Sequence, residues 1–157
     1  IFNEPLNREY SQDRVCYRDF MILMAAVDDN MGLMFNHRRQ SRDRLLRQRI
    51  LALAGDRTLW MDRYSAALFG AELDGHTVRV EEDFLAQAAP GDFCFLEDRS
   101  PRPAEENIEQ VVLFRWNRTY PADLHFALDH SRWTLTCSED FPGSSHDKIT
   151  QEVYTRA

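Results

Sequence analysis

An unbroken apolar run from Met21 to Val27 constrains the fold of this chain more than any other feature. A short run of this kind is typical of a strand that is buried on both faces of a sheet. The turn sequence Asp28-Asp29-Asn30-Met31-Gly32 follows it directly. The run is much too short to cross a bilayer. We therefore expect a buried central strand and no membrane partner.

A helix is predicted after this strand. Ser41 is a suitable N-cap, Asp43 stands in the first turn, where the helix dipole favours an acid, and Gly55 ends the pattern. One apolar face follows the helical repeat, and most arginines fall on the other face. The residues of the apolar face are Leu45, Leu46, Ile50 and Leu53.

Strand and helix patterns alternate through the rest of the chain. Further strands are predicted at 58–61, 77–80, 93–96 and 110–116, with short helices at 64–69, where Gly70 ends the pattern, at 81–89 and near Glu105. The tail contains two strands with no helix between them, at 133–137 and 149–154. This order predicts an α/β fold: a mixed, mostly parallel sheet flanked by helices, with an antiparallel pair of C-terminal strands. We expect residues 1–20 to form an N-terminal arm and residues 21–157 to form one domain.

Charge and cysteine content narrow the functional class. The net charge of −7 argues against non-specific nucleic-acid binding by the whole surface. Cys16, Cys94 and Cys137 are too widely spaced for a zinc or redox motif, and no histidine pattern suggests a metal site. Residues 1–20 contain no apolar segment typical of a secretory signal. We expect a cytoplasmic protein with buried, reduced thiols and no metal.

Several segments resemble the dihydrofolate reductases. They are MILMAAVDDNMG at 21–32, GDRTLWMDRYSAALF at 55–69 and DLHFALDHSRWTLTCSEDF at 123–141, with a last strand at 149–154. They follow the order of that family over residues 21–157. The resemblance implies a dihydrofolate reductase-like fold, and it implies NADPH and a pterin-like substrate if the activity is retained.

The positions that would hold the cofactor depart from the family pattern. Where the family has a Gly-Gly pair beside the cofactor diphosphate, this chain has Glu97 and Asp98. Asp62 replaces the glycine that precedes the phosphate-binding arginine, although Arg63 and Ser65 match the family. Carboxylates at these places would repel a diphosphate. The resemblance therefore implies the scaffold with an altered cofactor site.

Asp43 occupies the position of the family's catalytic acid. A buried carboxyl group there, with its pKa raised by desolvation, could protonate a pterin-like ring through water. Phe114 stands where the family has a threonine that bonds to this carboxylate, and phenylalanine cannot make that bond. The alternative is a helix-start acid that pairs with Arg39 or Arg47.

A basic run precedes the predicted helix. His37, Arg38, Arg39 and Ser41 could bind an anion together with backbone N–H groups at the helix start. The alternative is a solvated basic helix face.

The positions around Arg63 allow a similar choice. Arg63 and Ser65 could hold a phosphate if Asp62 points away, or could simply cap the short helix. Glu97 and Asp98 could pair with Arg63 or bind a cation, and a salt-bridged loop is favoured over a metal site.

Three functions are compatible with these patterns. The favoured one is a divergent dihydrofolate reductase-like protein that binds a nucleotide or another small anionic ligand, without ordinary dihydrofolate reductase activity. The second is an NADPH-dependent reductase of a pterin-like substrate, with Asp43 as proton source. The third, based on His37 and the arginines, is an RNA-binding or ribonuclease-associated module. The cofactor is left open, with NADPH expected only for the reductase.

Overall fold

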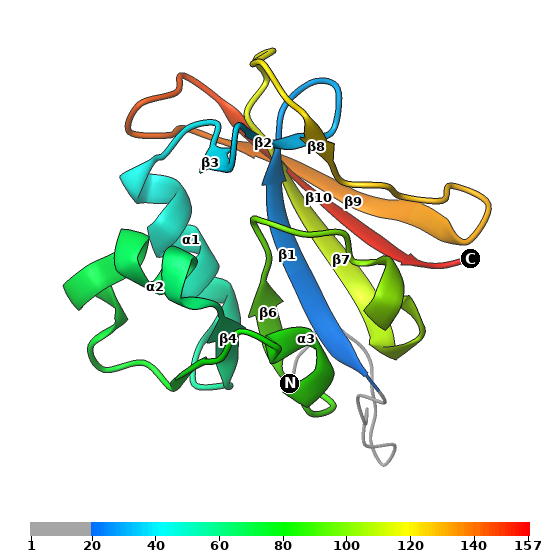
Figure 1. The fold of residues 1–157 in the computed structure, drawn as a ribbon. Helices are drawn as coiled ribbons and strands as arrows, with labels where there is room; N and C mark the ends of the chain where they lie inside the picture. Colours follow the sequence, from blue (N-terminus) through cyan, green and yellow to red (C-terminus); the bar gives the residue numbers. More distant parts are fainter. Residues whose placement is uncertain (1–19) are drawn as a thin grey trace.

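Seven strands form the central sheet of the computed structural model, which describes residues 20–157 (Figure 1). The strand order is β5-β4-β6-β1-β7-β10-β9. Strands β5, β4, β6, β1 and β7 run parallel, whereas β10 is antiparallel to both β7 and β9. The prediction of a mostly parallel sheet with an antiparallel C-terminal pair is confirmed. The strand bounds are β1 Met21–Val27, β4 Leu59–Met61, β5 Val78–Val80, β6 Phe93–Phe95, β7 Ile108–Arg115, β9 Trp133–Phe141 and β10 Ile149–Arg156.

The central position of β1 explains its unbroken apolar sequence. Its side chains alternate between the two faces of the sheet. Leu23 and its odd-numbered neighbours belong to one core cluster with Phe84, whereas Ile22 and Met24 belong to the other with Ile50. The strand is therefore buried on both faces, as the sequence predicted.

Helices cover both faces of this sheet. Their bounds are α1 Arg44–Ala54, α2 Arg63–Phe69, α3 Phe84–Gln87, and the 3-10 helices η1 Gly70–Leu73 and η2 Arg102–Asn107. The predicted cap of α1 was wrong, because Asp43 and not Ser41 is the N-cap, and its carboxylate accepts the N–H of Leu46. Gly55 and Gly70 end α1 and α2, as predicted, with positive φ.

A second, three-stranded sheet was not predicted. Its order is β3-β2-β8, with β2 at Gly32–Phe35, β3 at Arg38–Arg39 and β8 at Leu124–His125. Asn36 and His37 form the two-residue turn between β2 and β3, and both have positive φ, as a type I′ hairpin turn requires. This sheet lies beyond the carboxyl end of β1 (Figure 1).

The predictions for the N-terminal arm and for the cysteines compare with the structure as follows in residues 20–157. The N-terminal arm lies almost entirely in residues 1–19, outside the described residues, as does Cys16. Cys94 is buried as predicted, but Cys137 is exposed because β9 is an edge strand whose middle no other element of residues 20–157 covers. Within residues 20–157, no helix is long and apolar enough to span a membrane.

Candidate functional site

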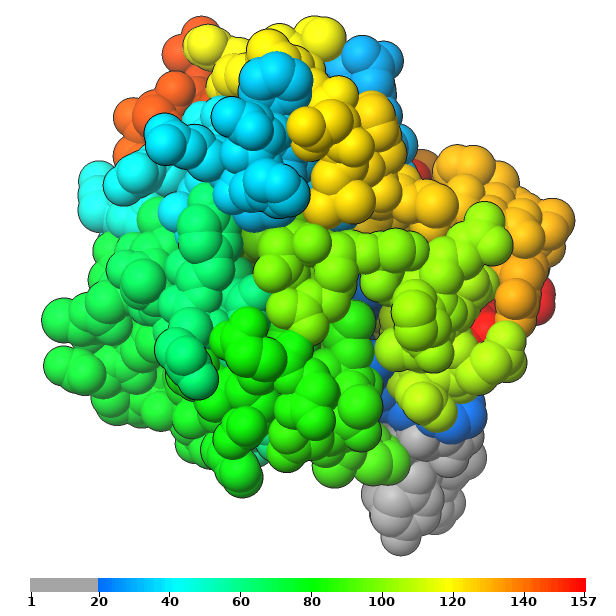
Figure 2. All heavy atoms as spheres, in the orientation of Figure 1, coloured from blue at the N-terminus to red at the C-terminus, as the bar shows by residue number. Residues whose placement is uncertain are grey.

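A pocket of about 570 Å³ lies where three parts of the chain meet. The small sheet forms one wall, the start of α2 a second, and the loop after β6 a third. Figure 2 shows these segments side by side on one face of the molecule. The volume is in the usual range for small-molecule sites. The lining residues are Met34, His37, Tyr64, Asp98, Asp123 and Leu124.

Glu97 lies beside this pocket and is held by a bidentate ion pair with Arg39. The guanidinium Nε and Nη2 of Arg39 lie 2.9 and 3.0 Å from the two carboxylate oxygens. The hydroxyl of Ser65 donates to the same carboxylate at 2.7 Å. Burial lowers the pKa of Arg39, but the hydrogen bond and charge of Glu97 outweigh burial and raise it above its ordinary value. These three residues, all named from the sequence, therefore satisfy one another.

Arg39 also fixes the ring of Tyr64. Its backbone N–H donates to the Tyr64 hydroxyl at 2.9 Å, and its guanidinium carbon lies 4.0 Å from the ring centroid. A tyrosine held by a hydrogen bond and a cation–π contact presents a rigid wall to the pocket.

Asp98 and Asp62 share the guanidinium of Arg99. Arg99 lies 2.7 Å from an oxygen of Asp98 and 3.0 Å from an oxygen of Asp62. Burial, together with the neighbouring Asp98, raises the pKa of Asp62. The predicted salt-bridged loop is present, but its proposed partner Arg63 was wrong, because Arg39 and Arg99 take the two acids. Among the described residues, no group of three or more histidine, cysteine or acidic residues could hold a metal ion.

The N–H groups at the start of α2 already have protein acceptors. The N–H of Arg63 donates to the Glu82 carboxylate at 3.1 Å, and that of Ser65 donates to Asp62 at 2.9 Å. Asp62 therefore points toward the helix start and caps it.

The backbone N–H groups at the start of α1 also have protein acceptors. The N–H of Arg44 donates to the Ser144 hydroxyl at 2.8 Å, and that of Leu46 donates to Asp43. Arg38 is exposed on β3, and His37 stands at the hairpin turn. The predicted anion site at this helix start stays untested, but its backbone donors are in use.

Asp43 is fully enclosed by the loop between β9 and β10. Its carboxylate accepts the backbone N–H groups of Ser144 at 2.9 Å and Ser145 at 2.8 Å, as well as a bond from His146 Nδ1 at 3.1 Å. Burial alone would raise the pKa of Asp43, but these hydrogen bonds outweigh it and hold the pKa well below its ordinary value. The expected raised pKa was therefore wrong, and so was the pairing with Arg39 or Arg47, since Arg47 pairs with Glu72.

His146, which was not among the site residues predicted from the sequence, extends this network. Its Nε2 lies 3.2 Å from the Ser41 hydroxyl and 3.0 Å from the Tyr120 hydroxyl, and its ring stacks on Trp116. Asp43, His146 and Ser41 thus have the connectivity of a Ser-His-Asp triad. The side chain of His146 is only 2% exposed, however, and its Nε2 is shared with Tyr120. We interpret the network as the link that fixes the loop to α1.

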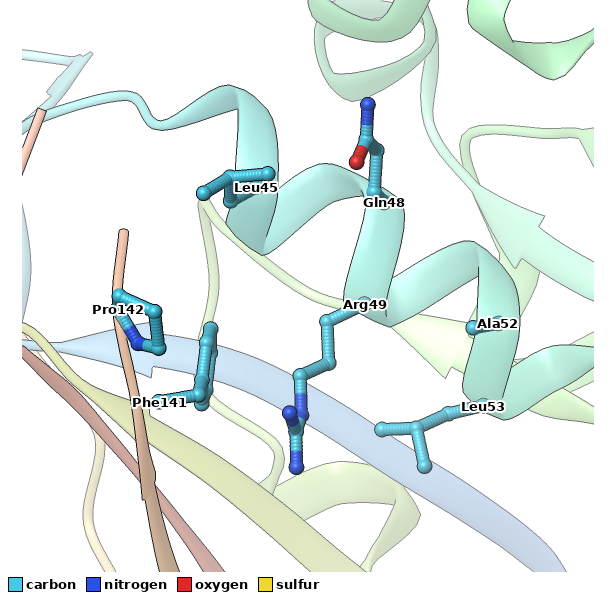
Figure 3. A pocket seen from close by; sticks show the side chains of 7 residues that line it. All are labelled: Leu45, Gln48, Arg49, Ala52, Leu53, Phe141 and Pro142. Atoms are coloured by element: carbon cyan, nitrogen blue, oxygen red, sulfur yellow. The ribbon is translucent and has the colours of Figure 1, made fainter. Parts of the chain in front are cut away.

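A second hollow lies along the outer side of α1 (Figure 3). It is mostly apolar, and the guanidinium of Arg49 lies over the Phe141 ring at 4.2 Å. It lacks the converging polar groups of a specific small-molecule site. Its lining residues are Leu45, Gln48, Arg49, Ala52, Leu53, Phe141 and Pro142.

Comparison with known proteins identifies the fold. No protein-family model matches the chain, and no curated protein matches its sequence. Among solved structures, the chain is similar to the dihydrofolate reductase from Enterococcus faecalis complexed with NADP(H) and RAB-propyl, with a TM-score of 0.63. The match covers 90% of this chain and 99% of that one, at 12% identity. The chain has a dihydrofolate reductase-like fold. The similarity predicted from the sequence is confirmed at the level of fold.

Proposed function

We propose that this dihydrofolate reductase-like domain binds a small molecule in the pocket beside Tyr64 and does not use NADP(H) as a reductase does. The observation that carries the proposal is the occupation of the expected diphosphate position by carboxylates of the chain itself. Asp62 and Glu82 accept N–H groups at the start of α2, and Glu97 follows β6.

A diphosphate would have to displace these groups. The N–H donors of Arg63 and Ser65, which could face a phosphate at this helix start, are already bonded to carboxylates. If a phosphate replaced these carboxylates, the N–H groups would exchange one anion for another and would gain no new charge attraction. The residues present therefore do not fit the diphosphate of a dinucleotide.

Displacement of Glu97 would also break a largely buried ion pair. The side chains of Arg39 and Glu97 are 15% and 10% exposed. Removal of one partner from such a pair leaves an uncompensated charge, at a cost of about 3 kcal/mol or more. The binding of a diphosphate would have to exceed this cost.

The environment of Asp43 also argues against a role as the proton source of a reductase. Its side chain is 0% exposed, and the hydrogen bonds from the loop between β9 and β10 lower its pKa and favour the ionised form. Phe114, at the threonine position, is fully buried and packs edge-to-face on Phe141. Both features support ligand binding without the reductase reaction.

The pocket itself supports the binding of a small ligand. Its walls come from separate segments, and they combine apolar, aromatic and acidic side chains. Sites of this kind hold the body of a ligand by apolar contact and orient it by a few polar groups. The absence of a nucleic-acid partner and a cytoplasmic location remain predictions from the sequence.

Titration with NADPH tests the proposal. A protein that binds NADPH gains about 2.7 kcal/mol of stability at a concentration a hundred times the Kd. We expect no thermal stabilisation of this protein at millimolar NADPH and no dihydrofolate-dependent oxidation of NADPH. The Enterococcus faecalis enzyme is the positive control. Saturable NADPH binding, with turnover that Asp43→Asn abolishes, would instead establish the reductase function.

A further inference from the structure

The charges of the side chains that line the pocket indicate the class of ligand, which the fold alone does not. Two of its six lining residues, Asp98 and Asp123, are acids, none is a lysine or an arginine, and His37 is the one basic side chain among the six. A cavity lined by charges of one sign concentrates ligands of the opposite sign.

Asp123 supplies the uncompensated charge. Its carboxylate oxygens accept the backbone N–H of Asn36 at 3.1 and 3.3 Å, which fixes the side chain on the wall of the pocket. Across residues 20–157, no ion pair to Asp123 is present. A neutral N–H partner orients a carboxylate but leaves its charge, so Asp123 can still attract a cation.

Asp98, which also lines the pocket, shares its arginine partner with a second acid. Arg99 serves both Asp98 and Asp62, so one positive charge faces two carboxylates. The neighbouring pair of Arg39 and Glu97 is balanced and adds no net charge. Within residues 20–157, Arg39 and Arg99 are therefore both engaged by acids, and His37 is the only basic side chain of the lining.

Apolar groups form the remaining surface. Met34 is buried, Leu124 is half-buried, and the Tyr64 ring is fixed by Arg39. A flat hydrocarbon or aromatic body can pack on these side chains, while a charged end reaches the acids.

We infer that the pocket binds a small cation, namely a protonated amine or amidine on a flat apolar body, with Asp123 and Asp98 as its counter-charges. The inference rests on the proposed function and replaces the anionic ligand that the arginine-rich sequence predicted. Those arginines either pair with acids, as Arg39 does, or, like Arg38, do not line the pocket.

Three ligands of one shape and different charge test this inference. Benzamidine, benzamide and benzoate carry a positive, a zero and a negative charge on nearly the same body. They are titrated into the full chain, and binding is located from the NMR shifts of the backbone amides of Tyr64 and Leu124. We expect benzamidine to bind about ten-fold or more tightly than benzoate, and its binding to weaken as salt is added.

Asp123→Asn provides the test at the level of the residue. The variant keeps an oxygen that can accept the Asn36 N–H but loses the charge. It should weaken benzamidine about ten-fold and leave benzamide unchanged, whereas the exposed control Asp56→Asn should change neither. The salt titration on the unmodified protein gives an independent readout if the variant does not fold.

A result that contradicts the ligand class can be distinguished from one that contradicts the proposed pocket. If benzoate or benzamide binds in this pocket as tightly as benzamidine, the ligand class is overturned and the binding function stands. If none of the three shifts the pocket amides at millimolar concentration, both the ligand class and the proposed pocket are overturned.

Discussion

The carboxylate of Asp43 lies 3.1 Å from Nδ1 of His146, a residue 103 positions later in the chain. This contact joins the N-cap of α1 to the loop between β9 and β10. Both side chains are buried: that of Asp43 is 0% exposed and that of His146 is 2% exposed. The loop and the helix start therefore depend on each other.

Asp43→Asn should destabilise the protein by on the order of 3 kcal/mol. The substitution removes the charge that accepts the N–H groups of Ser144, Ser145 and Leu46, and it points an amide donor at groups that are themselves donors. Urea unfolding followed by circular dichroism measures the change. Asp147→Asn, at an exposed position one residue after His146, is the matched control and should stay within about 0.5 kcal/mol of the unmodified protein.

The same carboxylate should give the protein a defined acid sensitivity. Because the pKa of Asp43 is lower in the folded protein than in the unfolded chain, its contribution is complete above the unfolded value of about 3.9. It is lost as the pH falls below that value toward the folded pKa. The difference in melting temperature between the unmodified protein and Asp43→Asn should therefore be constant near neutral pH and shrink below about pH 4. A constant difference down to the most acidic pH at which the protein folds would contradict this assignment.

Gly143 is the position in this loop with the least room for a side chain. A Cβ atom there would lie 2.4 Å from Oδ2 of Asp43 and 2.9 Å from the backbone oxygen of His146. Gly143→Ala must push the loop away from the carboxylate, so we expect a loss of about 1–3 kcal/mol, typical of overpacking at a closely packed site. Calorimetry would show the loss as a lower melting temperature. An unchanged melting temperature would mean that the loop moves aside without cost.

The sequence predicted the larger elements because their signals are local. The apolar run of β1 and the terminating Gly55 and Gly70 each lie within a few residues of the feature that they define. The small sheet was missed for the same reason. The two residues of β3 carry no pattern, and the hairpin turn uses Asn36 and His37 instead of the usual asparagine-glycine pair.

The candidate site was predicted only in part. The family resemblance brought Asp43, Asp62 and Glu97 to attention, but it could not supply their partners. Those partners come from distant segments: His146 for Asp43, Arg39 for Glu97 and Arg99 for Asp62. A pKa depends on such partners as well as on burial, which is why the direction of the shift at Asp43 could not be obtained from its sequence position.

The ion pair of Arg39 and Glu97 should show strong energetic coupling. The pair is bidentate and largely buried, and the hydrogen bond and charge of Glu97 raise the pKa of Arg39. A double-mutant cycle with Arg39→Met and Glu97→Gln should give a coupling energy of about 2 kcal/mol from the free energies of unfolding. The exposed pair of Lys148 and Asp140, 3.8 Å apart, is the control and should give about 0.5 kcal/mol or less. Equal coupling in both pairs would show that burial adds nothing at Glu97.

The two described cysteines should differ sharply in reactivity. Cys137 is exposed on edge strand β9, whereas Cys94 is buried in β6, where burial and the nearby charge of Asp92 raise the pKa of its thiol. Since the thiolate is the reactive form, iodoacetamide should modify Cys137 in the folded protein and reach Cys94 only after denaturation. Peptide mass spectrometry distinguishes the sites, and Cys137→Ser is the control for the fast reaction. Labelling of Cys94 at the same rate as Cys137 under native conditions would contradict the burial of Cys94 in the core that contains Phe84.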